Sequence, residues 1–87
     1  MDFHRSEFKH GQDEADIRHA VEHAIVVVQL DPEADPPKGL AIGPDAAGNL
    51  LEVIWLELAD NVNLVIHAMD LRPQFYDLLP TAEDPTP

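Results

Sequence analysis

The sequence predicts an α+β domain in which an N-terminal helix packs on a three- to four-stranded antiparallel sheet, with a short C-terminal helix. Two observations support this prediction. An amphipathic helical segment comes first, and four β-branched or apolar segments follow it, separated by turn-forming residues. With 87 residues the chain forms one small domain. We place this domain at residues 1–79 and expect the acidic, proline-rich tail at residues 80–87 to be disordered.

The predicted helix follows a polar N-terminal segment. Residues 1–10 carry two phenylalanines spaced to anchor a short helical turn or arm, which Gly11 ends. The helix begins near Asp13, because several acidic residues follow there and the helix dipole favours negative charge in the first turn. Apolar residues then recur at the spacing i, i+3, i+4 and i+7 of an amphipathic helix, namely Ile17, Ala20, Val21 and Ala24.

The first two strands are predicted from β-branched and apolar runs. Residues 25–30 form a strand that can serve as an exposed edge and pair with another copy of the chain, giving a homodimer. Residues 31–38 contain three prolines and therefore form an exposed loop. Leu40–Ile42 then make a brief strand, which a glycine-containing turn at residues 43–49 follows.

The two strongest strands are residues 50–58 and 62–69, joined by a short loop that is typical of an antiparallel hairpin. Both strands are almost continuously apolar, so we expect them at the centre of the sheet, covered by the helix on at least one face. Trp55 is predicted to lie in the core. Pro73 fits the first turn of the final helix, at residues 74–79.

Composition limits the classes of function. Seventeen acidic and five basic side chains give a formal net charge of −12, which repels nucleic-acid phosphates and favours basic partners. The chain has no cysteine, which excludes disulfides and thiolate metal sites. The apolar runs at residues 24–30 and 50–58 are too short to cross a bilayer, and no cleavable leader is evident. We therefore expect a cytoplasmic protein without membrane contact.

The most informative polar side chains lie in residues 65–76. His67 ends an otherwise apolar strand, where an imidazole is rare unless it is hydrogen-bonded or exposed. Arg72 follows it and adds a guanidinium that can hold an anion. Tyr76 comes about one turn later. A second group of basic and imidazole side chains lies near the N-terminus and includes Arg5, Lys9 and His10.

Several short motifs follow one another over residues 9–79. In order they are Lys9-His10-Gly11 before the helix, Ile42-Gly43, the turn glycine Gly48, the strand Leu51–Ile54, and Ile66-His67-Ala68 in the last strand. This order resembles that of BrnT-like toxins of bacterial toxin–antitoxin pairs, which are small RelE-like ribonucleases. Where that family usually carries an arginine this chain has Met69, and Arg72 follows shortly after as its replacement.

The resemblance implies a RelE-like fold and metal-independent cleavage of RNA without a cofactor. It also implies an antitoxin protein that inhibits the chain through a basic or amphipathic segment. Such cleavage requires a base, a cation near the phosphate and an acid. By this resemblance His67 is the base or the acid, Arg72 holds the phosphate, and Lys9 or His10 supplies the second imidazole or cation. Arg5 and Tyr76 would contact the substrate.

Each of these residues also has a purely structural interpretation. His67 can satisfy a backbone group at the strand edge, and Arg72 can pair with Asp70 or Asp77. The N-terminal cations can simply precede the helix. A second hypothesis is therefore a catalytically inactive, acidic interaction module of the same fold that binds a basic protein partner. The charge of −12 favours this second hypothesis, whereas the grouped histidine, arginine and lysine side chains favour the first.

One further pair of residues has the spacing of metal ligands. His19 and His23 lie four residues apart on one side of the predicted helix, which is a spacing that can hold zinc. No third ligand is evident, and a solvated polar face explains the pair better. We therefore predict no metal site.

Overall fold

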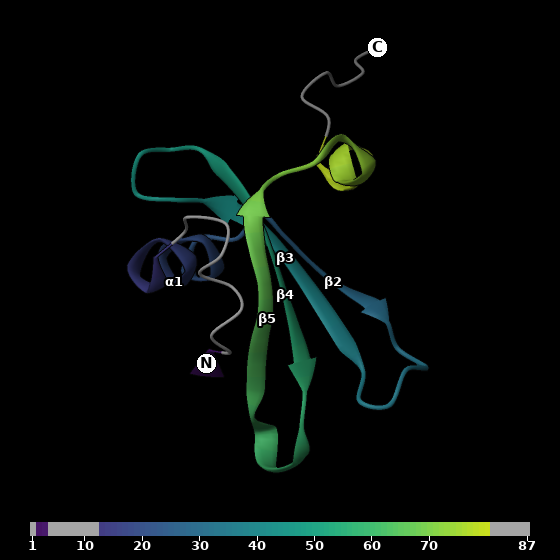
Figure 1. Ribbon diagram of the computed structural model, residues 1–87. Helices are drawn as coiled ribbons and strands as arrows, with labels where there is room; N and C mark the ends of the chain where they lie inside the picture. The colour runs from purple at the N-terminus through teal and green to yellow at the C-terminus, as the bar shows by residue number, and fades with distance from the viewer. Residues whose placement is uncertain (1, 4–12, 81–87) are drawn as a thin grey trace.

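The computed structural model describes residues 2–3 and 13–80. Predictions for the other residues, including the tail after residue 80 and the side chains of Arg5, Lys9 and His10, lie outside the described part. None of the helices in residues 13–80 is long and apolar enough to span a membrane. The elements in chain order are β1 (Asp2–Phe3), α1 (Glu14–Glu22), β2 (Val26–Asp31), β3 (Lys38–Pro44), β4 (Leu50–Glu57), the 3-10 helix η2 (Ala59–Asn61), β5 (Asn63–Asp70) and the 3-10 helix η3 (Pro73–Leu78) (Figure 1).

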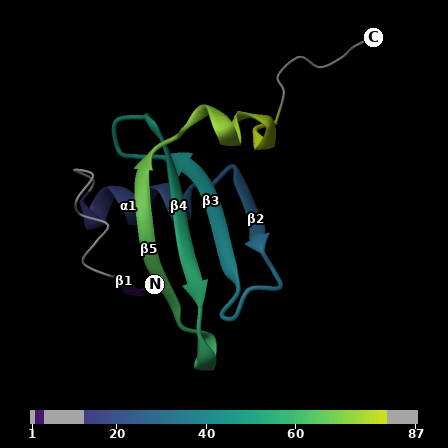
Figure 2. The same ribbon diagram turned by 45° about the vertical axis from the view of Figure 1, so that its right-hand side comes forward.

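The five strands form a single sheet in the order β1-β5-β4-β3-β2. Strands β2 to β5 pair antiparallel with one another, whereas β1 runs parallel to β5 beside Leu64 and Val65. Helix α1 covers one face of the sheet, and η3 lies on the opposite face near the end of β5 (Figures 1 and 2). The predicted α+β class is confirmed, with β1 as an additional short edge strand.

Helix α1 begins and ends where nearby residues satisfy its backbone. The Asp13 carboxylate accepts a hydrogen bond of 2.9 Å from the Asp16 N–H and so caps the first turn. At the other end, the His23 N–H donates to the carbonyl of His19. The helix covers nine residues and ends before Ala24, the last member of the predicted apolar pattern.

The contact between α1 and the sheet depends on small residues in β3. A Cβ on Gly43 would overlap the backbone carbonyl of Ala20, so only glycine lets α1 approach β3 this closely. A Cβ on Gly39 would overlap the indole of Trp55, which is buried as predicted. The buried cluster between α1 and the sheet consists of Ile17, Ala20, Ala41, Leu51, Val53, Trp55, Val65 and Ala68.

The turn between β3 and β4 is organised by Asp45. Its carboxylate accepts hydrogen bonds from the backbone N–H groups of Asn49, at 2.8 Å, and of Ala47, at 3.0 Å. The hydrogen bond from the Asn49 backbone is the largest cause that lowers the pKa of Asp45. Gly48 adopts a φ of 92°, which glycine reaches without strain. The predicted turn is confirmed at Gly48, whereas Gly43, which was expected to reach a positive φ in the same turn, lies within β3.

Three segments differ in extent or type from the prediction. Strand β3 runs over seven residues, longer than Leu40–Ile42, because its end residues also pair with β4. The C-terminal helix begins at Pro73 as expected but is a 3-10 helix, since the Phe75 N–H donates to the carbonyl of Arg72, three residues earlier. Residues 2–3 form a strand within the segment that was expected to be a helical turn or arm.

Gly43→Ala should lower the free energy of unfolding by about 2–3 kcal/mol, because the backbone of α1 must move away from β3. Gly48→Asn should lower it by only about 1 kcal/mol, because a Cβ at Gly48 meets no atom within 4 Å and asparagine adopts a positive φ with less strain than most residues. Urea unfolding followed by the fluorescence of Trp55 measures both variants. Equal effects of the two substitutions would contradict the tight packing assigned to Gly43.

Candidate functional site

The candidate site is built around one buried carboxylate, that of Glu52. Glu52 lies in the middle of β4, with Ile42 of β3 and Met69 of β5 as its neighbours across the sheet. Its side chain is on the face opposite α1, because the adjacent Leu51 and Val53 point into the α1-facing cluster. Glu52 is completely buried. An ionised carboxylate in such a position requires partners that satisfy its charge and its lone pairs.

Arg72 provides the first set of partners for Glu52. Its Nε and Nη2 atoms contact the Oε2 atom of Glu52 at 2.8 Å and 2.6 Å, and its backbone N–H donates to Oε1 at 2.9 Å. The chain reaches this position because the Leu71 N–H donates to the carbonyl of Leu50, which extends the pairing of β4 and β5 by one residue. Pro73 then starts η3 and turns the chain across the sheet.

His67 provides the third partner. It lies on the same face of β5 as Met69, diagonally across from Glu52, and its Nε2 atom is 2.8 Å from Oε2 of Glu52. The side chain of His67 is 21% exposed, whereas that of Glu52 is fully buried. The imidazole therefore connects a buried charge to the surface of the sheet. We call Glu52, His67 and Arg72 the Glu52 cluster.

Burial and hydrogen bonding act on Glu52 in opposite directions. Burial alone raises the pKa of the Glu52 carboxyl, but the hydrogen bonds from Arg72 and His67 outweigh it and hold this pKa below its usual value. In return, the Glu52 carboxylate raises the pKa of Arg72. Glu52 is therefore ionised at neutral pH. An ionised carboxylate can only accept hydrogen bonds, so the Nε2–H of His67 donates to it.

The Glu52 cluster combines two chemical capacities. Glu52 fixes the ring of His67 in one orientation, which is how carboxylates prepare histidines for proton transfer. The side chain of Arg72 is 38% exposed, and its guanidinium uses the Nε–Nη2 edge for Glu52. Its other edge, formed by Nη1 and the second hydrogen of Nη2, can bind an anion. The cluster can therefore hold a phosphate-like group close to an oriented imidazole.

The structure brings together two of the predicted site residues. His67 and Arg72 converge on Glu52, because the Nε2 atom of His67 and the Nε atom of Arg72 each lie 2.8 Å from its Oε2 atom. The sequence interpretation did not single out Glu52. The signal that could have identified it is a lone carboxylate within the apolar run of residues 50–56, the same kind of anomaly that drew attention to His67.

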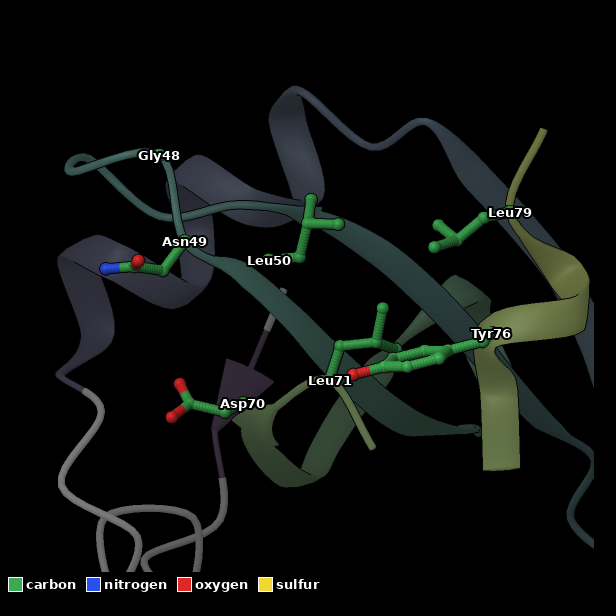
Figure 3. A pocket seen from close by; sticks show the side chains of 7 residues that line it. All are labelled: Gly48, Asn49, Leu50, Asp70, Leu71, Tyr76 and Leu79. Atoms are coloured by element: carbon green, nitrogen blue, oxygen red, sulfur yellow. The ribbon is translucent and has the colours of Figure 1, made fainter. Parts of the chain in front are cut away.

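Tyr76 lines an adjacent pocket of about 730 Å³, at the start of β4 and the end of β5. The residue is 53% exposed. Figure 3 shows leucine side chains gathered near the ring, whereas the side chains of Asn49 and Asp70 point away from it. The pocket lies next to the Glu52 cluster along the chain, because Leu71 lines the pocket and the next residue, Arg72, belongs to the cluster. Its lining residues are Gly48, Asn49, Leu50, Asp70, Leu71, Tyr76 and Leu79.

The two helix histidines are used for local contacts. The Nδ1 atom of His19 is 2.7 Å from the carbonyl oxygen of Pro44, and the Nδ1 atom of His23 is 2.9 Å from that of His19. The two rings stack with their centroids 4.2 Å apart. Within residues 2–3 and 13–80, no group of three or more histidine or acidic side chains is arranged to hold a metal ion.

Comparisons of this chain with protein-family models, with curated proteins and with solved structures find no match. The chemistry of the chain must therefore be inferred from the Glu52 cluster and from the pocket beside it. The roles expected for Lys9, His10 and Arg5 in RNA cleavage stay predictions, because these residues lie outside the described part of the chain.

Arg72→Met should lower the free energy of unfolding by about 2–4 kcal/mol, because Glu52 stays buried and keeps only His67 of its two side-chain partners. The double variant Glu52→Gln/Arg72→Met should lose at least about 1 kcal/mol less than the sum of the two single variants. Arg18→Met is the matched control. It removes an exposed pair with Glu14 and should cost no more than about 0.5 kcal/mol. Strict additivity in urea unfolding would rule out the coupling.

Acid should weaken the contribution of Glu52 to stability. Because the pKa of Glu52 is lowered on folding, the unfolded state binds the proton more tightly, and stability is lost as pH falls through the folded-state pKa. The difference in unfolding free energy between wild type and Glu52→Gln should be full at about pH 7 and shrink below about pH 4. The raised pKa of Arg72 leaves its charge constant over this range. A pH-independent difference would contradict this assignment.

Proposed function

We propose that this chain is the toxin component of a bacterial type II toxin–antitoxin pair and that it cleaves RNA without a metal ion at the Glu52 cluster. The observation that carries the proposal is the convergence of His67 and Arg72 on the buried carboxylate of Glu52. A buried carboxylate whose pKa is shifted by the partners gathered around it is typical of functional sites. The resemblance of the sequence to BrnT-like toxins supports the same function.

In the proposed reaction, the 2′-hydroxyl of RNA attacks the adjacent phosphorus and the 5′-oxygen leaves. His67 takes or returns a proton, and Glu52 keeps its ring oriented. Arg72 binds the phosphate through the guanidinium edge that does not contact Glu52 and stabilises the charge that develops in the transition state. Tyr76 offers an exposed ring on which a base can stack. Lys9 or His10 supplies the second proton carrier.

The charge of the chain agrees with control by a basic partner. A body with a net charge of −12 attracts basic proteins at long range and repels RNA, so RNA must be held by local contacts at the cluster. The proposed antitoxin contributes a basic or amphipathic segment that binds this body in the cytoplasm. Its removal would expose the site to RNA.

The alternative function, an inactive interaction module, is favoured by one observation. The buried Glu52 already neutralises Arg72 with two side-chain contacts and one backbone contact, so the cluster is complete as a structural unit. In this alternative, the cluster only fixes η3 on the sheet. The acidic surface then binds a basic protein, and no reaction takes place. The two functions make opposite predictions for variants that keep the fold.

Wild-type protein should cleave RNA in the presence of a metal chelator and leave 2′,3′-cyclic phosphate ends, and its induced expression should slow bacterial growth. His67→Gln should reduce the cleavage rate by about 100-fold or more, because proton transfer through an imidazole contributes at least that much. Arg72→Lys should also impair cleavage, since lysine cannot contact Glu52 and a phosphate with two planar edges. Cleavage of a labelled RNA pool and growth curves measure these effects.

His23→Gln is the matched control, because it removes an exposed histidine outside the cluster and should leave cleavage intact. Thermal melts must show that His67→Gln is folded. A wild-type protein that neither cleaves RNA nor slows growth would exclude the toxin function and support the inactive module. If His67→Gln cleaved RNA as fast as His23→Gln, the Glu52 cluster would be excluded as the site of cleavage.

A further inference from the structure

The edge of the sheet formed by β2 is unusual for a monomeric protein. Strand β2 is the last strand in the sheet order, and within residues 2–3 and 13–80 only β3 pairs with it. Val27 is 64% exposed, and Ile25, just before the strand, is 51% exposed. The run from Ile25 to Leu30 contains no charged residue and no proline. Edge strands of natural proteins normally carry charged residues or proline, which prevent pairing with a strand of another chain.

Within residues 2–3 and 13–80, the strand at the opposite edge of the sheet differs from β2. Strand β1 is only two residues long, and short edge strands pair poorly with other chains. The β-branched side chains of β2, in contrast, occupy both faces. Val27 lies on the α1 side, since its partner Ala41 belongs to the α1-facing cluster. Val26 and Val28 lie on the side of Glu52, because Val26 pairs with Ile42, the neighbour of Glu52.

We infer that β2 pairs with β2 of a second copy of this chain, so that one antiparallel sheet runs through both copies. A twofold axis perpendicular to the sheet at Val27 keeps all faces in register. Val27 then lies opposite Val27 of the second copy, and Val26 lies opposite Val28 of the second copy. Residues opposite one another thus share a face, and only uncharged side chains meet along the seam.

The lack of charged side chains in residues 25–30 favours a second copy of this chain over a basic protein as the partner of β2. Residues 25–30 carry no carboxylate of their own, and the carboxylate of Glu57, which lies beside them, already accepts hydrogen bonds from Gln29, whereas the chain's own β2 matches this neutral, β-branched edge on both faces. The acidic residues of β2 and its following loop begin only at Asp31. The pairing therefore keeps most of the charge of each body away from the interface, although the two net charges of −12 still repel each other at long range.

This arrangement has a consequence for the Glu52 cluster. A twofold axis perpendicular to the sheet leaves corresponding faces on the same side, so the two α1 helices cover one face and both Glu52 clusters lie on the other. The paired molecule would present two clusters to one partner. The inference stands independently of the proposed reaction, because it rests on β2 alone.

Sedimentation equilibrium of the full chain tests the pairing. Wild type should dimerise with a dissociation constant below about 100 µM at about 0.5 M NaCl, and lowering the salt to about 0.05 M should weaken it about threefold or more, since less of the mutual repulsion is screened. Val27→Lys should weaken dimerisation at least about tenfold, because it places two like charges directly opposite one another. Leu58→Lys makes the same change at another exposed apolar residue, 39% exposed, that is not part of β2, and should leave the dimer unchanged.

Hydrogen exchange gives a second measurement that does not depend on the variants. The amides of residues 26–28 should become more protected as the wild-type concentration rises, while those of the β4–β5 hairpin tip should not change. A wild type that stays monomeric at high concentration and high salt would overturn the inference. So would a dimer that Val27→Lys and Leu58→Lys weaken equally, or protection of β2 that appears only with an added basic protein.

Discussion

The burial of one negative charge, on Glu52, is the constraint on which the rest of the C-terminal half depends. A carboxylate with no exposed surface in the middle of β4 is stable only if other groups neutralise it and fill its lone pairs. Arg72 and His67 do so with contacts of 2.6–2.9 Å. These contacts fix the chain after β5 and the start of η3 on the sheet. The interaction that completes the fold is therefore also the one that assembles the candidate site.

Alternate residues of β4 lie in two different environments, one apolar and one polar. Leu51 and Val53 face α1 and join an apolar cluster, whose tight packing requires Gly43 in β3. Glu52, between them, faces the other way and needs polar partners. Because a strand alternates its side chains, the buried cluster and the polar cluster share one strand without mixing. Stability and any chemistry at the site are consequently coupled, and each must be measured when the other is changed.

Much of the architecture follows from local patterns in the sequence. The helical spacing of Ile17 and Ala20, the turn residues around Gly48 and Pro73 at the start of the last helix all appear in the structure in their expected roles. The length of β3 could not be read in this way, because its end residues are held in the sheet by pairing with β4 and not by their own preferences. The 3-10 form of η3 likewise depends on backbone contacts that composition does not reveal.

The sequence by itself determined the α+β class and the order of the elements from α1 to η3, and it singled out His67 and Arg72, because these features depend on local periodicity and on unusual residues in apolar surroundings. Only the tertiary structure decided which carboxylate holds them. The acids nearest to Arg72 in sequence include Asp70, but Asp70 pairs with Leu51, on the face that α1 covers. Glu52 is twenty residues from Arg72 and lies on the correct face. Glu52 is the partner because the alternation of side chains and the pairing register of the strands place it next to Arg72 and His67. Both are properties of the assembled sheet.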